Sequence, residues 1–202
     1  MATINYVRLF VHSWQRVLVL TVLGAVLALG FSLLQTLRYS STERILITQT
    51  NATGLDPYTA IKSTERIAQN LGEIIYTSSF FNAVMSKAQV DASYFPQDEI
   101  EKRKKWKETI ETQITAGTGV MAITAYHPSR DAARELSVTV AKELSETAPN
   151  YFGYSVRVQI IDDPLPSRFY AKPDFLRNAL FGAILGFLIA SAWILGRVKT
   201  VQ

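Results

Sequence analysis

The pattern of hydrophobic positions divides the chain into two long apolar segments and a mixed region between them. Val17–Leu34 and Ala179–Gly196 each run for 18 residues without a charged side chain. A bilayer core is spanned by about 20 apolar residues, and apolar neighbours lengthen both segments. The pattern therefore predicts transmembrane helices over residues 17–37 and 176–196.

A cleaved signal peptide is an alternative interpretation of the first segment. Arg8 and Arg16 precede it, and small residues such as Ala28 and Gly30 offer a cleavage site. The apolar core of a signal peptide is typically about 7–15 residues long, and this run continues past Gly30 to Leu34. A retained transmembrane helix is therefore favoured.

The first half of the central region predicts one strand followed by helices. Thr42–Thr50 mixes apolar and β-branched residues, as a strand does. Asp56 and Pro57 are a suitable N-cap and first residue for a helix. Further helices are expected over Thr77–Ala88 and over the polar stretch 97–111. The residues expected in the core are Ile61, Thr64, Ala68, Leu71, Ile75, Phe80, Phe81, Val84 and Met85.

The second half predicts strands around one long helix. Gln113–His127 carries glycines at 117 and 119 and is expected to form a bent strand or a hairpin. Ser129 is a candidate cap for a helix whose apolar stripe is Ala133, Leu136, Val140, Leu144 and Ala148. Ser155–Asp162 reads as a final strand. The expected fold class is α+β, a small sheet with helices on one face and its first and last strands adjacent.

Charge is distributed unevenly along the chain. Residues 38–175 hold 16 of the 21 basic and all 17 acidic residues, so the pI of 9.3 reflects basic membrane flanks. This argues against nucleic acid as a partner, since such proteins gather basic charge on a folded face. Basic flanks predict cytoplasmic tails, 1–16 and 197–202, and an extracytoplasmic domain over 38–163. The reverse orientation stays open because Arg38, Arg44, Arg168 and Lys172 flank the other side.

Prolines precede the second apolar segment. Pro164, Pro166 and Pro173 exclude a regular helix and predict a stiff extended strut over residues 164–175. An ordinary linker is the alternative.

Small residues recur inside the second segment. Gly182, Gly186 and Ala190 stand four residues apart, a spacing that lets membrane helices approach closely. Gly24 and Ala28 of the first segment are the expected partners. The alternative is that glycine is simply common in membrane helices.

This combination of features resembles the Wzz-type polysaccharide co-polymerases, or chain-length determinant proteins. The likeness rests on two terminal spans, an α+β domain, Pro164-x-Pro166 with Pro173, and Gly182-x-x-x-Gly186. The chain has Ala171-Lys172-Pro173 where the family often has Ser-Pro-Lys, and its length is that of the short members. The resemblance implies a non-enzymatic ring of identical subunits in the bacterial inner membrane. It also implies a lipid-linked glycan, a polysaccharide polymerase and, in some members, a cytoplasmic tyrosine kinase as partners.

No catalytic, cofactor or metal site is predicted. His12 and His127 have no ligand partners at metal spacing, and His127 is expected to be a solvated turn residue. The pair Asp162-Asp163 is expected to end a strand, and no phosphate-binding Gly-x-x-x-x-Gly-Lys-Ser/Thr sequence is present.

The basic run around residue 104 has two interpretations. Glu99/Arg103 and three further pairs at i,i+4 spacing are typical of a solvated helix. Alternatively, the run contacts an acidic glycan, a lipid phosphate or a neighbouring subunit through Lys102, Arg103, Lys104, Lys105 and Trp106.

The predicted function is control of the chain length or the export of a bacterial surface polysaccharide, such as a capsule, an exopolysaccharide or an O-antigen. A two-span membrane sensor with an external ligand-binding domain is the alternative. An enzyme, such as a glycan hydrolase, is the least favoured class.

Overall fold

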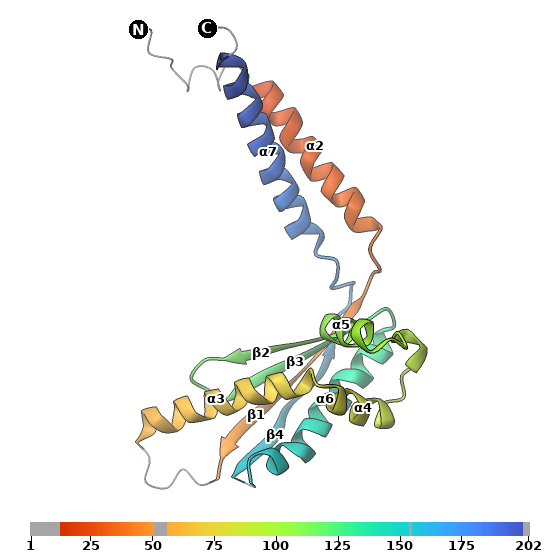
Figure 1. Ribbon diagram of the computed structural model, residues 1–202, viewed down its shortest axis with the longest axis vertical. Coiled ribbons are helices and arrows are strands. Elements are labelled where there is room, and N and C mark those ends of the chain that lie inside the picture. The colour runs from red at the N-terminus through yellow and green to blue at the C-terminus, as the bar shows by residue number, and fades with distance from the viewer. Residues whose placement is uncertain (1–12, 51–55, 154, 200–202) are drawn as a thin grey trace. The chain divides into compact units, whose positions relative to one another are not determined.

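The computed structural model describes residues 13–50, 56–153 and 155–199. They form two compact units, drawn in Figure 1: one from the described residues up to 37 together with those from 172 onward, and one from the described residues between 38 and 171. The first is a pair of helices and the second is a mixed α+β unit, as the hydrophobic pattern predicts.

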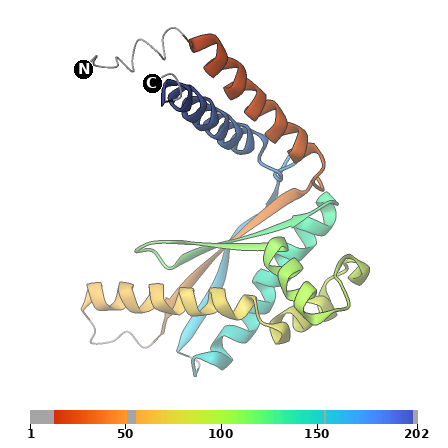
Figure 2. The same cartoon turned by 45° about the horizontal axis from the view of Figure 1, so that its top comes forward.

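The helical unit consists of α2 (Trp14–Leu33) and α7 (Phe175–Lys199), which lie side by side (Figures 1 and 2). By length and composition, Trp14–Leu33 and Phe175–Gly196 are able to cross a membrane. Helix α2 ends earlier than the predicted residue 37, because Leu34 donates its backbone N–H to Phe31 in a tightened last turn.

The α+β unit is built on an antiparallel four-stranded sheet in the order β2-β3-β1-β4. The strands are β1 (Tyr39–Gln49), β2 (Ile110–Thr115), β3 (Val120–His127) and β4 (Val156–Pro166). The expected pairing of the first and last strands is confirmed, with Gln49 opposite Val156. Gln113–His127 forms a hairpin and not one bent strand, since Gly117 and Gly119 adopt the positive φ that its turn needs.

Helices cover one face of this sheet, as Figures 1 and 2 show. They are α3 (Pro57–Ile75), α4 (Ser78–Lys87), α5 (Glu99–Thr109) and α6 (Arg130–Tyr151), with a short 3₁₀ turn, η1 (Ala92–Tyr94). The predicted caps are formed. Asp56 accepts hydrogen bonds from two backbone N–H groups of α3, and Ser129 accepts one at the start of α6.

The core lies between the helices and the covered face of the sheet. The predicted stripe of α6 is fully buried, and so are Ala68, Leu71 and Ile75 of α3. Ile61 was expected in the core but is 45% exposed, because it borders an open pocket beside Ile47. Alternate residues of β1 face the core, and one of them is the buried acid Glu43.

Candidate functional site

The two apolar helices meet through backbone contact at glycines. A Cβ atom added to Gly182 would lie 2.5 Å from the Cβ of Ala28, and one added to Gly24 would lie 3.1 Å from the Cα of Gly186. Added Cβ atoms on Gly182 and Gly186 would also collide with the backbone carbonyls of Gly24 and Leu20. Only glycine fits at these three positions without separating the helices.

We call the contact surface between α2 and α7 the glycine seam. Its other residues are small or polar. Ala190 is fully buried, one turn beyond Gly186. The Asn178 side-chain amide donates to Ser32 Oγ at 2.8 Å, and Ser32 Oγ donates to the Ala28 carbonyl at 2.9 Å. Such bonds satisfy polar groups that lipid would leave without partners.

The predicted strut over residues 164–175 is not one continuous segment. Pro164 and Pro166 belong to β4, in which Pro166 lies opposite Ser41. Strand β4 is an edge strand with register shifts near Arg44, so prolines are tolerated where no ladder donor is needed. Pro173 is buried and belongs to the helical unit. The strand therefore extends four residues beyond Asp162, its predicted end.

Trp106 is a core residue and is unable to contact a glycan or another subunit. It is 1% exposed, and its indole Nε1 donates to the Ile75 carbonyl at 2.8 Å. Its ring packs edge-on against Phe81 at 5.1 Å between centroids. Its place as the only aromatic residue in a polar helix was the sequence signal for a side chain that anchors α5 to the core.

The basic side chains of α5 point to two different sides. Lys102 pairs with Glu99 at 3.4 Å, and the ammonium of Lys105 lies 4.6 Å from the centre of the Tyr94 ring. Arg103 and Lys104 instead line a shallow groove of about 780 Å³. Its remaining lining residues are Glu73, Tyr76, Thr77, Ser78, Ser79, Lys107 and Glu108.

Lys107 was missed as a candidate, although its spacing of three and four residues from Lys104 and Arg103 puts it on the same helix face. Its ammonium lies 5.9 Å from the centre of the Tyr76 ring. Lys104 and Lys107 are both exposed. The groove therefore presents ammonium groups beside hydroxyls, a chemistry suited to phosphate or carboxylate.

Three carboxylates modify the charge around this groove. The Ser78 hydroxyl and then Arg103 lower the pKa of Glu99 to about 2, so Glu99 stays ionised and offsets Arg103. Glu108 pairs with Arg38 at 3.5 Å. Glu73 is an exposed carboxylate of the lining and opposes part of the positive charge. The positive charge that faces solvent is therefore carried mainly by Lys104 and Lys107, with Glu73 beside them.

The other ionisable candidates have structural roles. His127 is half-buried and not solvated: its Nδ1 accepts from the Ser129 N–H at 3.0 Å, and burial lowers its pKa. Asp162 pairs with Arg44 at 3.2 Å on the sheet. His12 lies outside the described residues. Within the described residues, no group of three or more His, Asp or Glu side chains is arranged to hold a metal ion.

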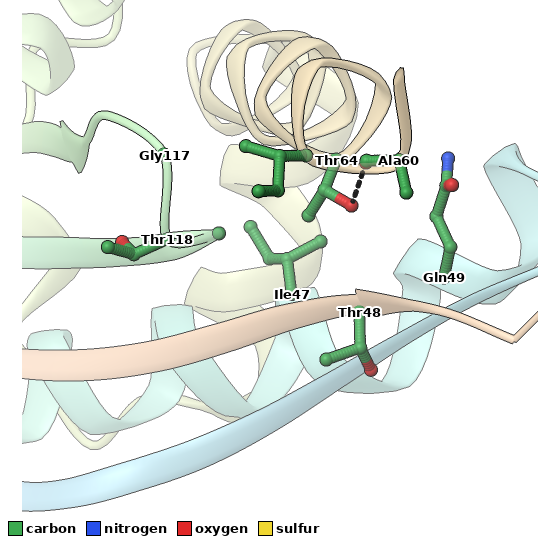
Figure 3. A pocket seen from close by; sticks show the side chains of 9 residues that line it. Ile47, Thr48, Gln49, Ala60, Thr64, Gly117 and Thr118 are labelled. Carbon is green, nitrogen blue, oxygen red and sulfur yellow. Dashed lines mark hydrogen bonds between the residues drawn. The ribbon is translucent and has the colours of Figure 1, made fainter. Parts of the chain in front are cut away.

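A separate pocket of about 220 Å³ lies where β1 ends and α3 begins (Figure 3). Ile47 and Thr64 face each other across it, and Gln49 donates to Ser63 Oγ at 2.7 Å at its rim. A Cβ added to Gly119 would lie 2.6 Å from the Ile47 carbonyl, so glycine lets the hairpin turn close one side. The sequence interpretation treated this glycine as a turn residue only and did not predict the pocket.

The sequence matches no protein-family model and no curated protein. The arrangement of residues within each unit therefore carries the functional argument.

Proposed function

We propose that the chain is a non-enzymatic, two-span membrane protein that presents an α+β domain outside the cytoplasm. The observation that carries this proposal is the glycine seam between α2 and α7, two helices that each have enough apolar residues to span a bilayer. Most of the remaining surface of both helices is exposed and apolar, as a lipid-facing surface is.

The proposed topology has cytoplasmic tails and an extracytoplasmic domain in a bacterial inner membrane. It is supported by the basic residues that flank the apolar segments, among them Arg16 and Arg197. Strands β1 and β4, which pair with each other, are the points at which the chain enters and leaves the domain. The domain would thus be held at both ends by one helix pair.

The proposed role is control of the length or export of a surface polysaccharide. The resemblance to the chain-length determinants supports it, together with a cationic, hydroxyl-lined groove suited to acidic groups. In this role identical subunits assemble into a ring, act beside a polymerase that uses a lipid-linked glycan, and in some systems contact a tyrosine kinase. The chain itself would form and break no bond.

Deleting the gene and sizing the surface glycan by gel electrophoresis tests this function. We expect the length distribution or the yield to change, and the wild-type chain to restore it. Gly182→Ile should fail to restore it, whereas Gly196→Ile, whose added Cβ meets nothing within 4 Å, should succeed. An unchanged glycan in the deletion strain would contradict the proposal.

The pocket in Figure 3 favours a second candidate, a membrane sensor that binds a small ligand. Its lining combines the apolar Ile47 and Ile61 with hydroxyl and amide groups, which suits a small amphipathic molecule. A thermal-shift screen of monosaccharides and short oligosaccharides would detect binding. Ile61→Trp, which fills the pocket from its rim, should abolish a genuine shift.

A further inference from the structure

The ends of the sheet show which part of the α+β unit adjoins the two chain connections. Ala171 donates its N–H to the Arg38 carbonyl at 2.8 Å, and Ser167 donates to the Ser40 carbonyl at 2.7 Å. The entering and leaving segments are therefore neighbours. We call this part of the unit, residues 38–40 and 167–171, the connection end.

Helix α5 lies at the connection end. The Arg38 guanidinium donates to the backbone carbonyl of Glu108, in the last turn of α5, at 3.2 Å. The next strand begins at Ile110, opposite Ala125, which in turn lies opposite Ser41. Lys107 directly precedes Glu108 and Lys104 lies about one turn before it, so the groove's ammonium groups are close to the points where the chain enters and leaves.

The connection end also exposes large apolar side chains. Phe169 is 82% exposed. Tyr170 is exposed as well, with its ring 4.6 Å from that of Tyr39. Arg168 stands exposed beside them. Aromatic side chains next to cations are typical of protein surfaces at the membrane–water interface.

Chain length limits how far this end can lie from the apolar helices. Four residues separate α2 from Arg38, and three separate Ala171 from α7. Fully extended, four residues reach only about 14 Å. If α2 and α7 span a bilayer, as in the proposed function on which this inference rests, the connection end faces the headgroup layer.

We propose that the connection end docks on anionic lipid headgroups of the membrane that holds α2 and α7. Lys104, Lys107 and Arg168 attract the headgroup phosphates, and Phe169 enters the interface between headgroups and acyl chains. An acidic glycan would satisfy the cations but would leave Phe169 in water, so lipid accounts for both the cations and this aromatic side chain. Docking would fix the tilt of the domain on the membrane.

The full chain in lipid nanodiscs provides the test, and the absence of native cysteine makes single-site labelling simple. A fluorophore on Ser79→Cys, at the exposed rim of the groove, is quenched by headgroup-spin-labelled lipid when the domain docks. We expect strong quenching in discs with about one-third phosphatidylglycerol and weak quenching in phosphatidylcholine alone. Thr118→Cys, in the turn between β2 and β3, should stay unquenched in both.

Charge reversal identifies the residues responsible. Lys104→Glu with Lys107→Glu should lower the docked fraction by at least about tenfold, since each lysine becomes a repelled carboxylate. Lys62→Glu with Lys142→Glu, an equal charge change at exposed positions on α3 and α6, should leave docking intact. Phe169→Ser should weaken quenching while the charge is unchanged.

A probe on Leu188→Cys separates failure of this inference from failure of the proposed function. Leu188 is exposed on α7, so acyl-chain nitroxides quench it if the helix is inserted. A quenched Leu188 probe with a Ser79 probe insensitive to lipid charge would overturn docking alone. A Ser79 probe that responds to soluble polygalacturonate and not to phosphatidylglycerol would assign the groove to acidic glycan and would equally overturn it.

Discussion

Replacing Gly182 with alanine tests the glycine seam by the smallest possible change. The added Cβ would lie 2.5 Å from the Ala28 Cβ and would also meet the Gly24 carbonyl. Carbon atoms pack best at about 3.5–4.0 Å, so the helices must separate by about 1 Å at this point. A gap of that size forfeits a quarter to a half of the contact energy along the seam, and overpacking typically costs about 1–3 kcal/mol.

Two matched variants separate packing from helix propensity. Gly30→Ala and Gly196→Ala add the same methyl group where nothing lies within 4 Å. All three substitutions gain the propensity difference between glycine and alanine, about 1 kcal/mol in a helix interior. Only Gly182→Ala also has the steric overlap, so the difference between it and the controls measures the seam.

The assay uses a disulfide between the helices. Asn178 and Ser32 are hydrogen-bonded across the seam at 2.8 Å, so Ser32→Cys with Asn178→Cys should cross-link on oxidation. Titrating micelles with dodecyl sulfate separates the helices, and counting the remaining thiols gives the midpoint. Gly182→Ala should lower this midpoint relative to both controls. Equal midpoints for all three variants would refute a close glycine contact.

Three further outcomes concern the α+β unit and are measured by thermal unfolding of the full chain in detergent. Trp106→Ala should lower the free energy of unfolding by about 3–5 kcal/mol because it leaves a cavity in the core. An unchanged free energy of unfolding would contradict the burial of this side chain. Burial, followed by the charge of a nearby aspartate, raises the pKa of Glu43. The folded chain therefore favours the protonated carboxyl. Its contribution to stability is complete below the ordinary pKa of about 4.3 and is lost as pH rises through the folded-state pKa. Glu43→Gln should therefore stabilise the chain increasingly from pH 4 to 7, and a constant or shrinking difference would contradict this. Gly119→Ala should lower the free energy of unfolding more than Gly117→Ala does. Both glycines have positive φ, but only a Cβ at Gly119 would meet the Ile47 carbonyl, at 2.6 Å. Equal losses of stability would show that backbone strain is the sole effect and would contradict the steric contact.

Local patterns in the sequence were sufficient to predict most of the elements. The apolar stripe of α6 is buried as its spacing predicted, and Asp56 and Ser129 cap the helices that they were expected to begin. The pairing of β1 with β4 was predicted because both strands connect to the apolar helices. Such predictions succeed because capping and periodicity depend on near neighbours in the chain.

The predictions that failed depend on contacts between distant segments. The position of Trp106 in a polar helix indicated a buried anchor, but nothing in the sequence indicated its partner, the Ile75 carbonyl, 31 residues away. Pro164 and Pro166 were expected to leave the sheet, but an edge strand with bulges accommodates them. The pocket beside Gly119 needs the hairpin turn to meet α3, a contact that neither segment encodes alone.

The most direct test of the account is whether the intact chain remains in the membrane with its two ends on one side. Single cysteines at Thr3 and Thr200, in the tails, and at Glu101 and Gln159, in the α+β unit, can be labelled with an impermeant maleimide. In sealed cells we expect the two domain positions to react and the two tail positions to react only after permeabilisation. The 22.6 kDa chain should stay in alkali-washed membranes. A shortened chain in the soluble fraction, cleaved near Gly30, or a tail and the domain labelled from the same side, would contradict the account.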